Sequence, residues 1–275
     1  MDGVINAGRA PRPERWAVTW RPAPRAAMRL FCLPHAGGGA ATFRRWAQLL
    51  APDIEVVAIR LPGRESRLAE RPCQRIDQLV PALVRDLEPW LYKRHAWFGH
   101  SMGAGVAFEV CRLMRRLDLP PAERLIVAAA PAPQLPRREP PVHDAPVGDL
   151  LGRLRELNGT SAEVLDELPM LMPLIPMLRA DFALAENHAY RPEHPLRLPI
   201  SVYGGTADES VNDEELAAWR HQSSLDTSVR LFDGGHFFVH DADGAVPHAV
   251  ATDLLEAGRS DHNENNGGLH VSYQC

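Results

Sequence analysis

The sequence is poor in lysine, in paired cysteines and in long apolar runs. Lys93 is the one lysine among 30 basic residues, and the formal net charge is -5, which excludes the basic field of a nucleic-acid-binding protein. The four cysteines form no C-x-x-C pair, so we expect free thiols in a reducing compartment. The N-terminus lacks the apolar core of a secretory signal, and no run is long enough to span a bilayer. These absences predict a cytoplasmic protein that binds neither nucleic acid nor membrane.

Short apolar runs alternate with helical patterns through most of the chain. Strands are predicted at residues 29–33, 55–59, 96–98, 125–129, 200–203 and 229–232, and helices at 43–50, 76–92, 103–117, 214–221 and 245–256. This alternation predicts one α/β domain over residues 26–258, with a mostly parallel sheet covered by helices on both faces. A proline-rich leader at 1–25 is expected to be flexible, and a polar tail at 259–275 to be disordered.

Residues 131–190 interrupt this rhythm, because they contain proline-rich loops and helical stretches at 147–157 and 162–178 but no strand pattern. An insert of this length between two strands predicts a small second domain or a lid over the sheet. Met170, Met172 and Met177 lie within it. Because methionine adapts to varied apolar shapes, these residues are candidates for binding substrate. Packing of the insert against the sheet explains them equally well.

The motif G-H-S-M-G at residues 99–103 places one serine, Ser101, between a predicted strand and a predicted helix. In that context G-x-S-x-G indicates a tight turn that exposes a nucleophilic hydroxyl. Side chains at Gly99 and Gly103 would collide with neighbouring elements, which explains the glycines. The helix that follows directs its N-terminus at whatever binds beside the serine.

A serine nucleophile needs a base and a group that orients the base. On this type of sheet the expected order is serine, acid, histidine. Asp208 follows the predicted strand 200–203, and His236 follows the last predicted strand, so both meet that order. Glu209 and Asp213 are the nearest alternatives to Asp208 as the acid.

An oxyanion hole would complete the site, with one backbone N–H from Met102 and a second from the loop P-H-A-G-G-G, where we choose Ala36. The same glycines do not complete a dinucleotide or P-loop pattern. His236 and His240 have the spacing of zinc-binding histidines, but the glutamate of H-E-x-x-H and a third ligand are missing. We therefore expect no metal site.

Five segments occur in an order that matches a known family: FCLPHAGGGAATFRRW, VVAIRLPGRESRLAERP, FGHSMGAGVAFEV, YGGTADESV and FDGGHFFVH. Over residues 29–255 they resemble the type II thioesterases that accompany modular polyketide and nonribosomal peptide synthases. The PHAGG, LPGRE and GGHFF pieces are the most specific of them. The leader and the tail lie outside the resemblance.

The resemblance implies an α/β-hydrolase fold with a helical lid between its sixth and seventh strands. It implies a monomeric enzyme without a cofactor of its own, since the phosphopantetheine belongs to the substrate. Members release aberrant acyl groups from the arm of acyl or peptidyl carrier protein domains. The family roles fall on Ser101 as nucleophile, on Asp208 and His236 as its partners, and on Met102 and Ala36 as oxyanion donors.

Carrier proteins are usually acidic near the arm, so arginines around the entrance are expected to dock them. The candidates by position are Arg64, Arg67, Arg137, Arg138, Arg153 and Arg155; a solvated charged surface is the alternative for each. Three other functions stay open: a carboxylesterase or lipase acting on free oxygen esters, a non-catalytic module that binds carriers, and a cyclising release domain. The complete set of four catalytic parts argues against the binding module, and the absence of a carrier segment before residue 26 argues against the release domain.

Overall fold

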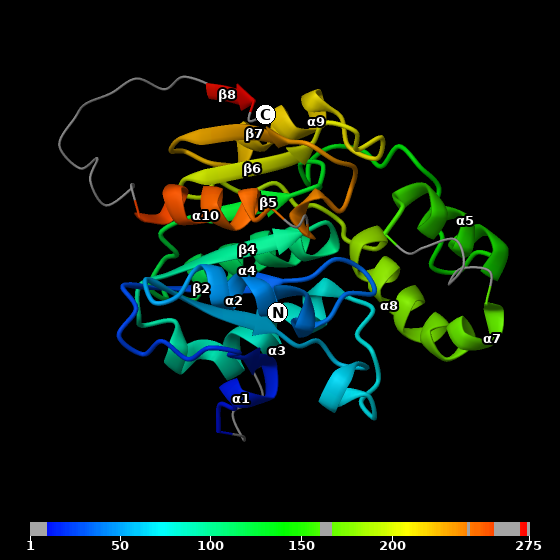
Figure 1. Cartoon of the computed structure of the whole chain (residues 1–275), viewed down its shortest axis with the longest axis horizontal. Helices are drawn as coiled ribbons and strands as arrows, with labels where there is room; N and C mark the ends of the chain where they lie inside the picture. Colours follow the sequence, from blue (N-terminus) through cyan, green and yellow to red (C-terminus); the bar gives the residue numbers. More distant parts are fainter. Residues whose placement is uncertain (1–9, 160–166, 241–242, 256–269, 274–275) are drawn as a thin grey trace.

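The computed structural model describes residues 10–159, 167–240, 243–255 and 270–273. They form one sheet with the order β1-β3-β2-β4-β5-β6-β7-β8, in which every neighbouring pair is parallel except β1 with β3 (Figure 1). Its strands are β1 (Ala17–Val18), β2 (Met28–Leu33), β3 (Ile54–Ile59), β4 (His95–His100), β5 (Leu125–Ala128), β6 (Ile200–Gly205), β7 (Thr227–Phe232) and β8 (His270–Tyr273). All six predicted strands are confirmed.

Helices cover both faces of the sheet, as the alternation predicted. They are α2 (Arg44–Leu49), α3 (Ile76–Leu87), α4 (Met102–Arg116), α9 (Asp213–Ala217) and α10 (Ala245–Leu255). Every residue of β3, β4 and β5 is buried, because helices pack against both of their faces. One apolar core lies between the sheet and α3, α4 and α9, and the other between the sheet and α2 and α10.

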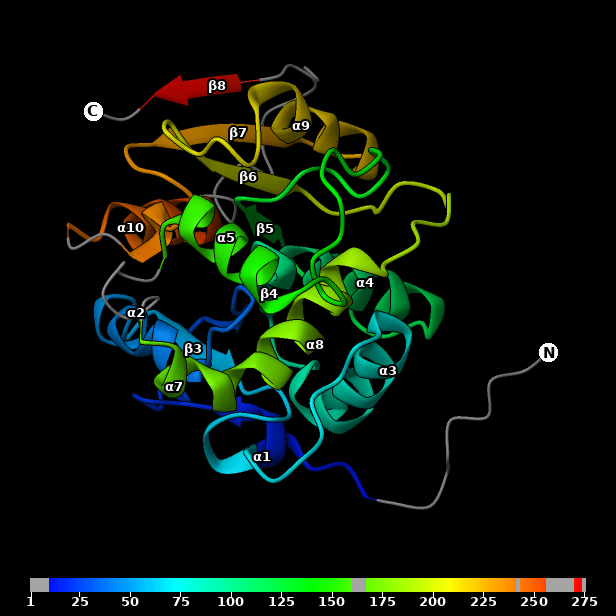
Figure 2. The ribbon, with the colours of Figure 1, turned by 90° about the vertical axis from the view of Figure 1, so that its right-hand side faces the viewer.

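The lid connects β5 to β6, one strand earlier in the numbering of this structure than the resemblance implied, and it lies beside the carboxyl ends of the central strands (Figures 1 and 2). It contains α5 (Val147–Leu157), α7 (Leu168–Leu171), a 3-10 turn at Met172–Leu174 and α8 (Ile175–Glu186). The helix predicted at 162–178 is interrupted by this turn, which contains a proline, and it continues to Glu186. Residues 162–166 of that prediction lie outside the described residues.

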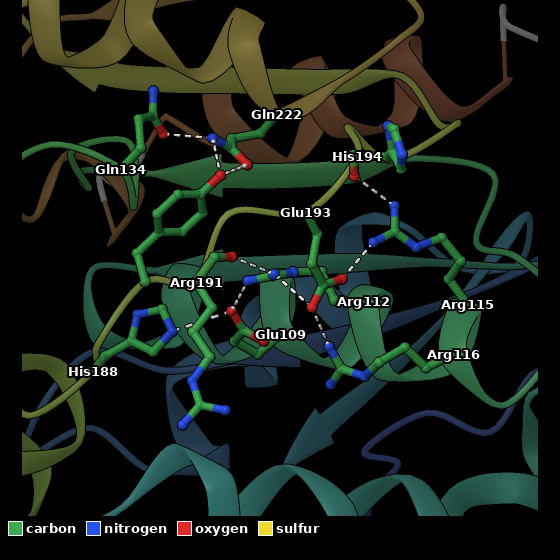
Figure 3. Close-up of polar contacts among 11 residues, drawn as sticks. Glu109, Arg112, Arg115, Arg116, Gln134, His188, Arg191, Glu193, His194 and Gln222 are labelled. Carbon is green, nitrogen blue, oxygen red and sulfur yellow. Dashed lines mark hydrogen bonds and ion pairs between the residues drawn. The ribbon is translucent and has the colours of Figure 1, made fainter.

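An ion-pair network ties the chain that follows α8 to the outer face of α4 (Figure 3). The Arg112 guanidinium lies 2.6 Å from Glu109 Oε1 and 2.7 Å from Glu193 Oε1, and it also donates to the backbone carbonyl of Arg191. His188 completes the network through Glu109. Since the Arg112 side chain is only 3% exposed, this end of the lid is firmly attached to the body of the domain.

The predicted flexible leader is wrong for residues 13–18, which form α1 (Pro13–Trp16) and β1. Trp16 is buried, its indole N–H donates to Asp86 Oδ2 at 2.8 Å, and the Arg67 guanidinium lies 4.1 Å above its ring. One buried aromatic side chain thus anchors a proline-rich segment to the core. Residues 1–9 lie outside the described residues.

The tail also differs from its prediction, because residues 270–273 form β8 beside β7. An apolar-polar alternation in this short segment suits an edge strand. The remaining residues of the predicted tail, 259–269 and 274–275, lie outside the described residues. No helix in the described part of the chain is long and apolar enough to cross a membrane.

Candidate active site

Ser101 lies on the turn between β4 and α4, with φ 54° and ψ -116°. A non-glycine residue with positive φ is strained, so the turn must be held by its surroundings. A Cβ on Gly99 would lie 2.2 Å from the carbonyl oxygen of Gly103, and one on Gly103 would lie 2.4 Å from the carbonyl oxygen of Leu33. Both glycines of the motif are therefore required by backbone contacts across the turn.

The structure brings Ser101, His236 and Asp208 into one hydrogen-bonded chain. Ser101 Oγ lies 3.0 Å from His236 Nε2, and His236 Nδ1 lies 2.9 Å from Asp208 Oδ2. Asp208 comes from the turn after β6 and His236 from the turn after β7, and both side chains are buried. In this geometry the Nδ1–H donates to the carboxylate and Nε2 accepts from the serine hydroxyl. Asp208, and not Glu209 or Asp213, contacts the imidazole.

Ser210 is part of the same arrangement, and the sequence reasoning missed it. Its hydroxyl donates to Asp208 Oδ1 at 2.6 Å and lies 2.9 Å from His236 Nδ1, while its amide donates to the same Oδ1. Burial on its own would raise the pKa of Asp208, but the hydrogen bonds from His236 and Ser210 outweigh it, and the net shift is downward. The carboxylate is therefore ionised at neutral pH. The segment A-D-E-S, with a hydroxyl two residues after the acid, was the available signal.

Replacing Ser210 with alanine is expected to lower kcat/KM about tenfold, because a hydrogen bond to a charged group is worth about 1.5–3 kcal/mol. The less stabilised carboxylate holds a proton on the Asp208–His236 pair more strongly, so the acid limb of the rate profile moves to higher pH. Steady-state rates from pH 5 to 9 measure both effects. The Ser210→Thr variant keeps the hydroxyl and serves as the control; an alanine variant with wild-type rate and profile would contradict the role.

The two backbone amides predicted for the oxyanion hole belong to the start of α4 and to the loop after β2. Met102 is the first residue of α4, where helix amides have no partner in the preceding turn. Ala36 lies in the loop after β2, which turns at Gly37 with φ +82°. Among the hydrogen bonds of the described residues, neither amide has an acceptor. Both are therefore available to a ligand.

Three further histidines form a cluster next to His236. His100 is completely buried, and its Nε2–H donates to the carbonyl oxygen of His236 at 2.9 Å. The rings of His35 and His240 contact that of His100, with centroids 5.0 and 5.4 Å away. The ligand atoms of these three residues lie within 4.8 Å of one another, so together they could hold a metal ion. His236 itself is engaged with Ser101 and Asp208, and the expectation of no metal stays a prediction.

Acid is expected to destabilise the protein below about pH 6.5. Burial lowers the pKa of His35 to about 3 and the pKa of His100 well below its usual range. Between pH 5 and 6.5 the unfolded chain therefore binds protons at these residues that the folded chain does not, and stability rises with pH by about 1.4 kcal/mol per unit for each histidine. Carboxylates titrate at lower pH in the unfolded chain, so they contribute little in this window.

Urea unfolding midpoints at pH 7, 6 and 5 test this expectation, with His35→Gln as the comparison. The wild type should lose stability steadily toward pH 5, and the variant should lose less, because burial also lowers the pKa of His240 and His95, which stay in the variant. Equal midpoints for the wild type at pH 7 and pH 5 would mean that the buried histidines are not kept neutral.

A pocket of about 340 Å³ opens beside Ser101 and His236. Its walls come from the chain that follows β5, from Leu157 of α5, from Phe182 of α8 and from Trp219. Apolar side chains thus form part of the pocket wall, together with charged ones, and the apolar part suits an acyl chain.

Met170, Met172 and Met177 are not among the residues that line this pocket, and their contact with substrate stays a prediction. Met170 and Met172 are 68% and 54% exposed, and Met177 packs at the border of the lid's own core. The reason is helical periodicity, since that core is formed by residues three or four apart: Leu171, Ile175, Leu178 and Phe182. Met170 and Met172 fall outside this inward stripe.

The six candidate arginines comprise two buried residues, three that line the pocket and one exposed residue outside it. Arg64 and Arg67 are buried and bound within the protein, so the structure removes them as docking residues. Arg137, Arg138 and Arg153 line the pocket, whereas Arg155 is exposed on α5 outside it. Arg137 donates to the carbonyl of Ala185, whereas Arg138 pairs with Glu215 and Arg153 with Glu139.

The family model of the thioesterase domain matches residues 28–254. The chain belongs to the thioesterase domain family. This thioesterase is 37% identical over 228 residues to the gramicidin S biosynthesis protein GrsT of Aneurinibacillus migulanus, covering 83% of this chain and 89% of that protein. It is 36% identical over 242 residues to the thioesterase PikA5 of Streptomyces venezuelae, covering 87% and 85%.

Solved structures agree with this assignment. The type II thioesterase BorB from the borrelidin biosynthetic cluster aligns with a TM-score of 0.80 and 35% identity, over 90% of this chain and 100% of that one. RedJ from the prodiginine pathway of Streptomyces coelicolor aligns with a TM-score of 0.78 and 31% identity, over 90% of each chain. The predicted α/β-hydrolase fold and the resemblance to type II thioesterases of polyketide and nonribosomal peptide clusters are confirmed.

Proposed function

We propose that this thioesterase hydrolyses acyl groups from the phosphopantetheine arm of acyl or peptidyl carrier protein domains, through an acyl-enzyme on Ser101. The hydrogen-bonded chain from Ser101 through His236 to Asp208, with Ser101 and His236 lining a pocket that has apolar walls in part, carries the proposal. The reaction needs no resident cofactor or metal, because the substrate brings the pantetheine and the imidazole supplies the base.

In the first half-reaction, Ser101 Oγ attacks the thioester carbonyl and His236 Nε2 takes the hydroxyl proton. Proton removal by His236 as general base contributes about 10²–10⁴ in rate. Asp208 stabilises the resulting imidazolium through the Nδ1–H bond. The amides of Met102 and Ala36 bind the oxyanion of the tetrahedral intermediate. When this intermediate collapses, the carbon–sulfur bond breaks, the imidazolium protonates the sulfur, and the pantetheine thiol leaves.

In the second half-reaction, water replaces the thiol. His236 removes a proton from the water as it attacks the acyl-serine carbonyl, and the same two amides bind the new oxyanion. The carbon–oxygen bond to Ser101 then breaks, the imidazolium returns its proton to Oγ, and the free acid departs. The enzyme is restored without a net change in protonation.

The pocket suggests release of varied acyl groups rather than recognition of a single product. Its lining includes the apolar side chains of Leu157, Phe182 and Trp219, and apolar contact discriminates weakly between chains that differ by one methylene. Such tolerance fits the removal of aberrant units from a stalled assembly line. At the mouth, Arg137 and Arg138 are exposed, and an acidic carrier domain is a partner of matching charge.

One experiment separates this proposal from a carboxylesterase or lipase activity and from a carrier-binding module without turnover. The enzyme is incubated with an acyl carrier protein, with the same acyl group on N-acetylcysteamine, and with its ethyl ester. We expect kcat/KM to fall in that order. A preference for the ethyl ester would favour the esterase function, and carrier binding without release of acid would favour the module.

A further inference from the structure

A buried carboxylate of the lid reaches across to the loop that carries the Ala36 amide. Asp181 lies on α8 and its side chain is 1% exposed. Its Oδ2 accepts the N–H of Gly37 at 2.8 Å, and its Oδ1 accepts from Arg64 Nη2 at 2.5 Å. Arg64 Nη1 donates in turn to the carbonyl oxygen of Gly38. Both oxygens of Asp181 are thus used to hold the backbone just after Ala36.

The loop has little freedom of its own around these contacts. Gly37 has φ +82°, and a Cβ there would lie 2.8 Å from the Leu178 side chain of α8, one turn before Asp181. On the other side, Glu65 Oε1 accepts the amide of Ala41. The helix α8 and the segment at 64–65 therefore both hold the backbone of this loop region, and the contact from α8 lies at the peptide next to the Ala36 amide.

Packing alone does not account for a charged pair at this place. The lid already has an apolar core of its own on α8. Burying a carboxylate and a guanidinium carries a desolvation cost that apolar side chains would avoid. What the pair supplies instead is direction, since a carboxylate with two bound donors fixes the peptide of Gly37 in orientation as well as position.

We propose that Asp181, together with Arg64, is a positioning residue that orients the Ala36 amide for the oxyanion, and so makes oxyanion binding depend on the docked position of the lid. The inference rests on the proposed acyl-enzyme function. Displacement of α8 would remove the acceptor of the Gly37 amide and release the loop. The chain that follows α8 would stay anchored to α4 by the Arg112 network (Figure 3), so docked and displaced arrangements would differ in the contact of α8 with this loop.

The test uses butyryl-N-acetylcysteamine and its dithioester analogue, in which sulfur replaces the carbonyl oxygen. Sulfur is the larger atom and the weaker hydrogen-bond acceptor, so well-placed amides favour the oxygen substrate. We expect Asp181→Asn to lower kcat for the thioester by about 10–100-fold with KM nearly unchanged, a fraction of the full loss of one oxyanion donor. The preference for thioester over dithioester should fall by a similar factor. Asp149→Asn, an exposed change on α5 of the same lid, should match the wild type.

A structural role without positioning would have a different outcome. Asp181→Leu and Asp181→Asn would then lower the melting temperature but leave both kcat and the preference at wild-type values, which would overturn the inference. If Asp181→Leu does not fold, the asparagine variant decides alone. The wild-type rate and its loss in Ser101→Ala are measured in parallel, so a serine-independent reaction would be recognised as failure of the proposed function and not of the Asp181 assignment.

Discussion

Ser101→Ala is expected to lower hydrolysis of an acyl carrier protein by at least about 10³-fold, because the acyl-enzyme cannot form and only binding and the oxyanion amides remain. In other serine hydrolases removal of the nucleophile costs up to about 10⁶ in kcat. Mass spectrometry of the carrier measures the result directly, since the acylated and free forms differ by the mass of the acyl group. The wild-type enzyme should also show a transient mass increase on its own chain, and the variant should not.

Ser224→Ala is a suitable control, because Ser224 is exposed and lies outside the pocket. It should release the acyl group at the wild-type rate. Should Ser101→Ala retain more than a tenth of the wild-type rate, another nucleophile or direct attack by water would have to carry the reaction, and the proposed mechanism would be wrong.

Asp208→Asn is expected to lower kcat by about 10⁴-fold while leaving the fold intact. The amide of asparagine donates to His236 Nδ1, so the ring carries its proton on Nε2 and can no longer accept the proton of Ser101. Because Asp208 makes short contacts with His236 and Ser210, an asparagine in its place has little room to turn its amide away from Nδ1. Single-turnover acylation with a chromogenic thioester measures the loss in the step that needs the base.

Glu209→Gln is the matched control, since Glu209 is the adjacent acid, is exposed and makes no contact with the imidazole. It should acylate at the wild-type rate. A large loss in Glu209→Gln together with a small loss in Asp208→Asn would reverse the assignment of the acid.

Local patterns in the chain were enough to predict the body of the domain and the groups of the site. Alternating apolar runs gave all six predicted strands, because strands buried on both faces must be apolar throughout. The G-x-S-x-G turn could be recognised because its glycines are required by contacts within a few residues of Ser101 and with the neighbouring strand. Asp208 and His236 could be placed by a topological rule, since both follow parallel strands that end at the same edge.

Contacts between distant segments could not be predicted in this way. The pairing of Ser210 with His236 joins residues of two different turns, and that of Arg64 with Asp181 joins residues 117 apart in the chain. The side of each lid helix that faces the pocket was equally undetermined, and Met170 and Met172 lie on an exposed side. Trp16, in a proline-rich leader, has its partners in Asp86 of α3 and in Arg67, both distant from it in the chain.

The sequence by itself therefore determined the layered fold, the chain order of Ser101, Asp208 and His236, and the turn that carries the serine, because each depends on local periodicity, sterics or strand order. The tertiary structure alone decided which hydroxyl supports the acid, which carboxylate holds the Ala36 loop and which residues line the pocket. Those choices depend on the direction and burial of side chains from segments that meet only on folding. Neither the composition of a segment nor its residue spacing indicates which distant side chain it will contact.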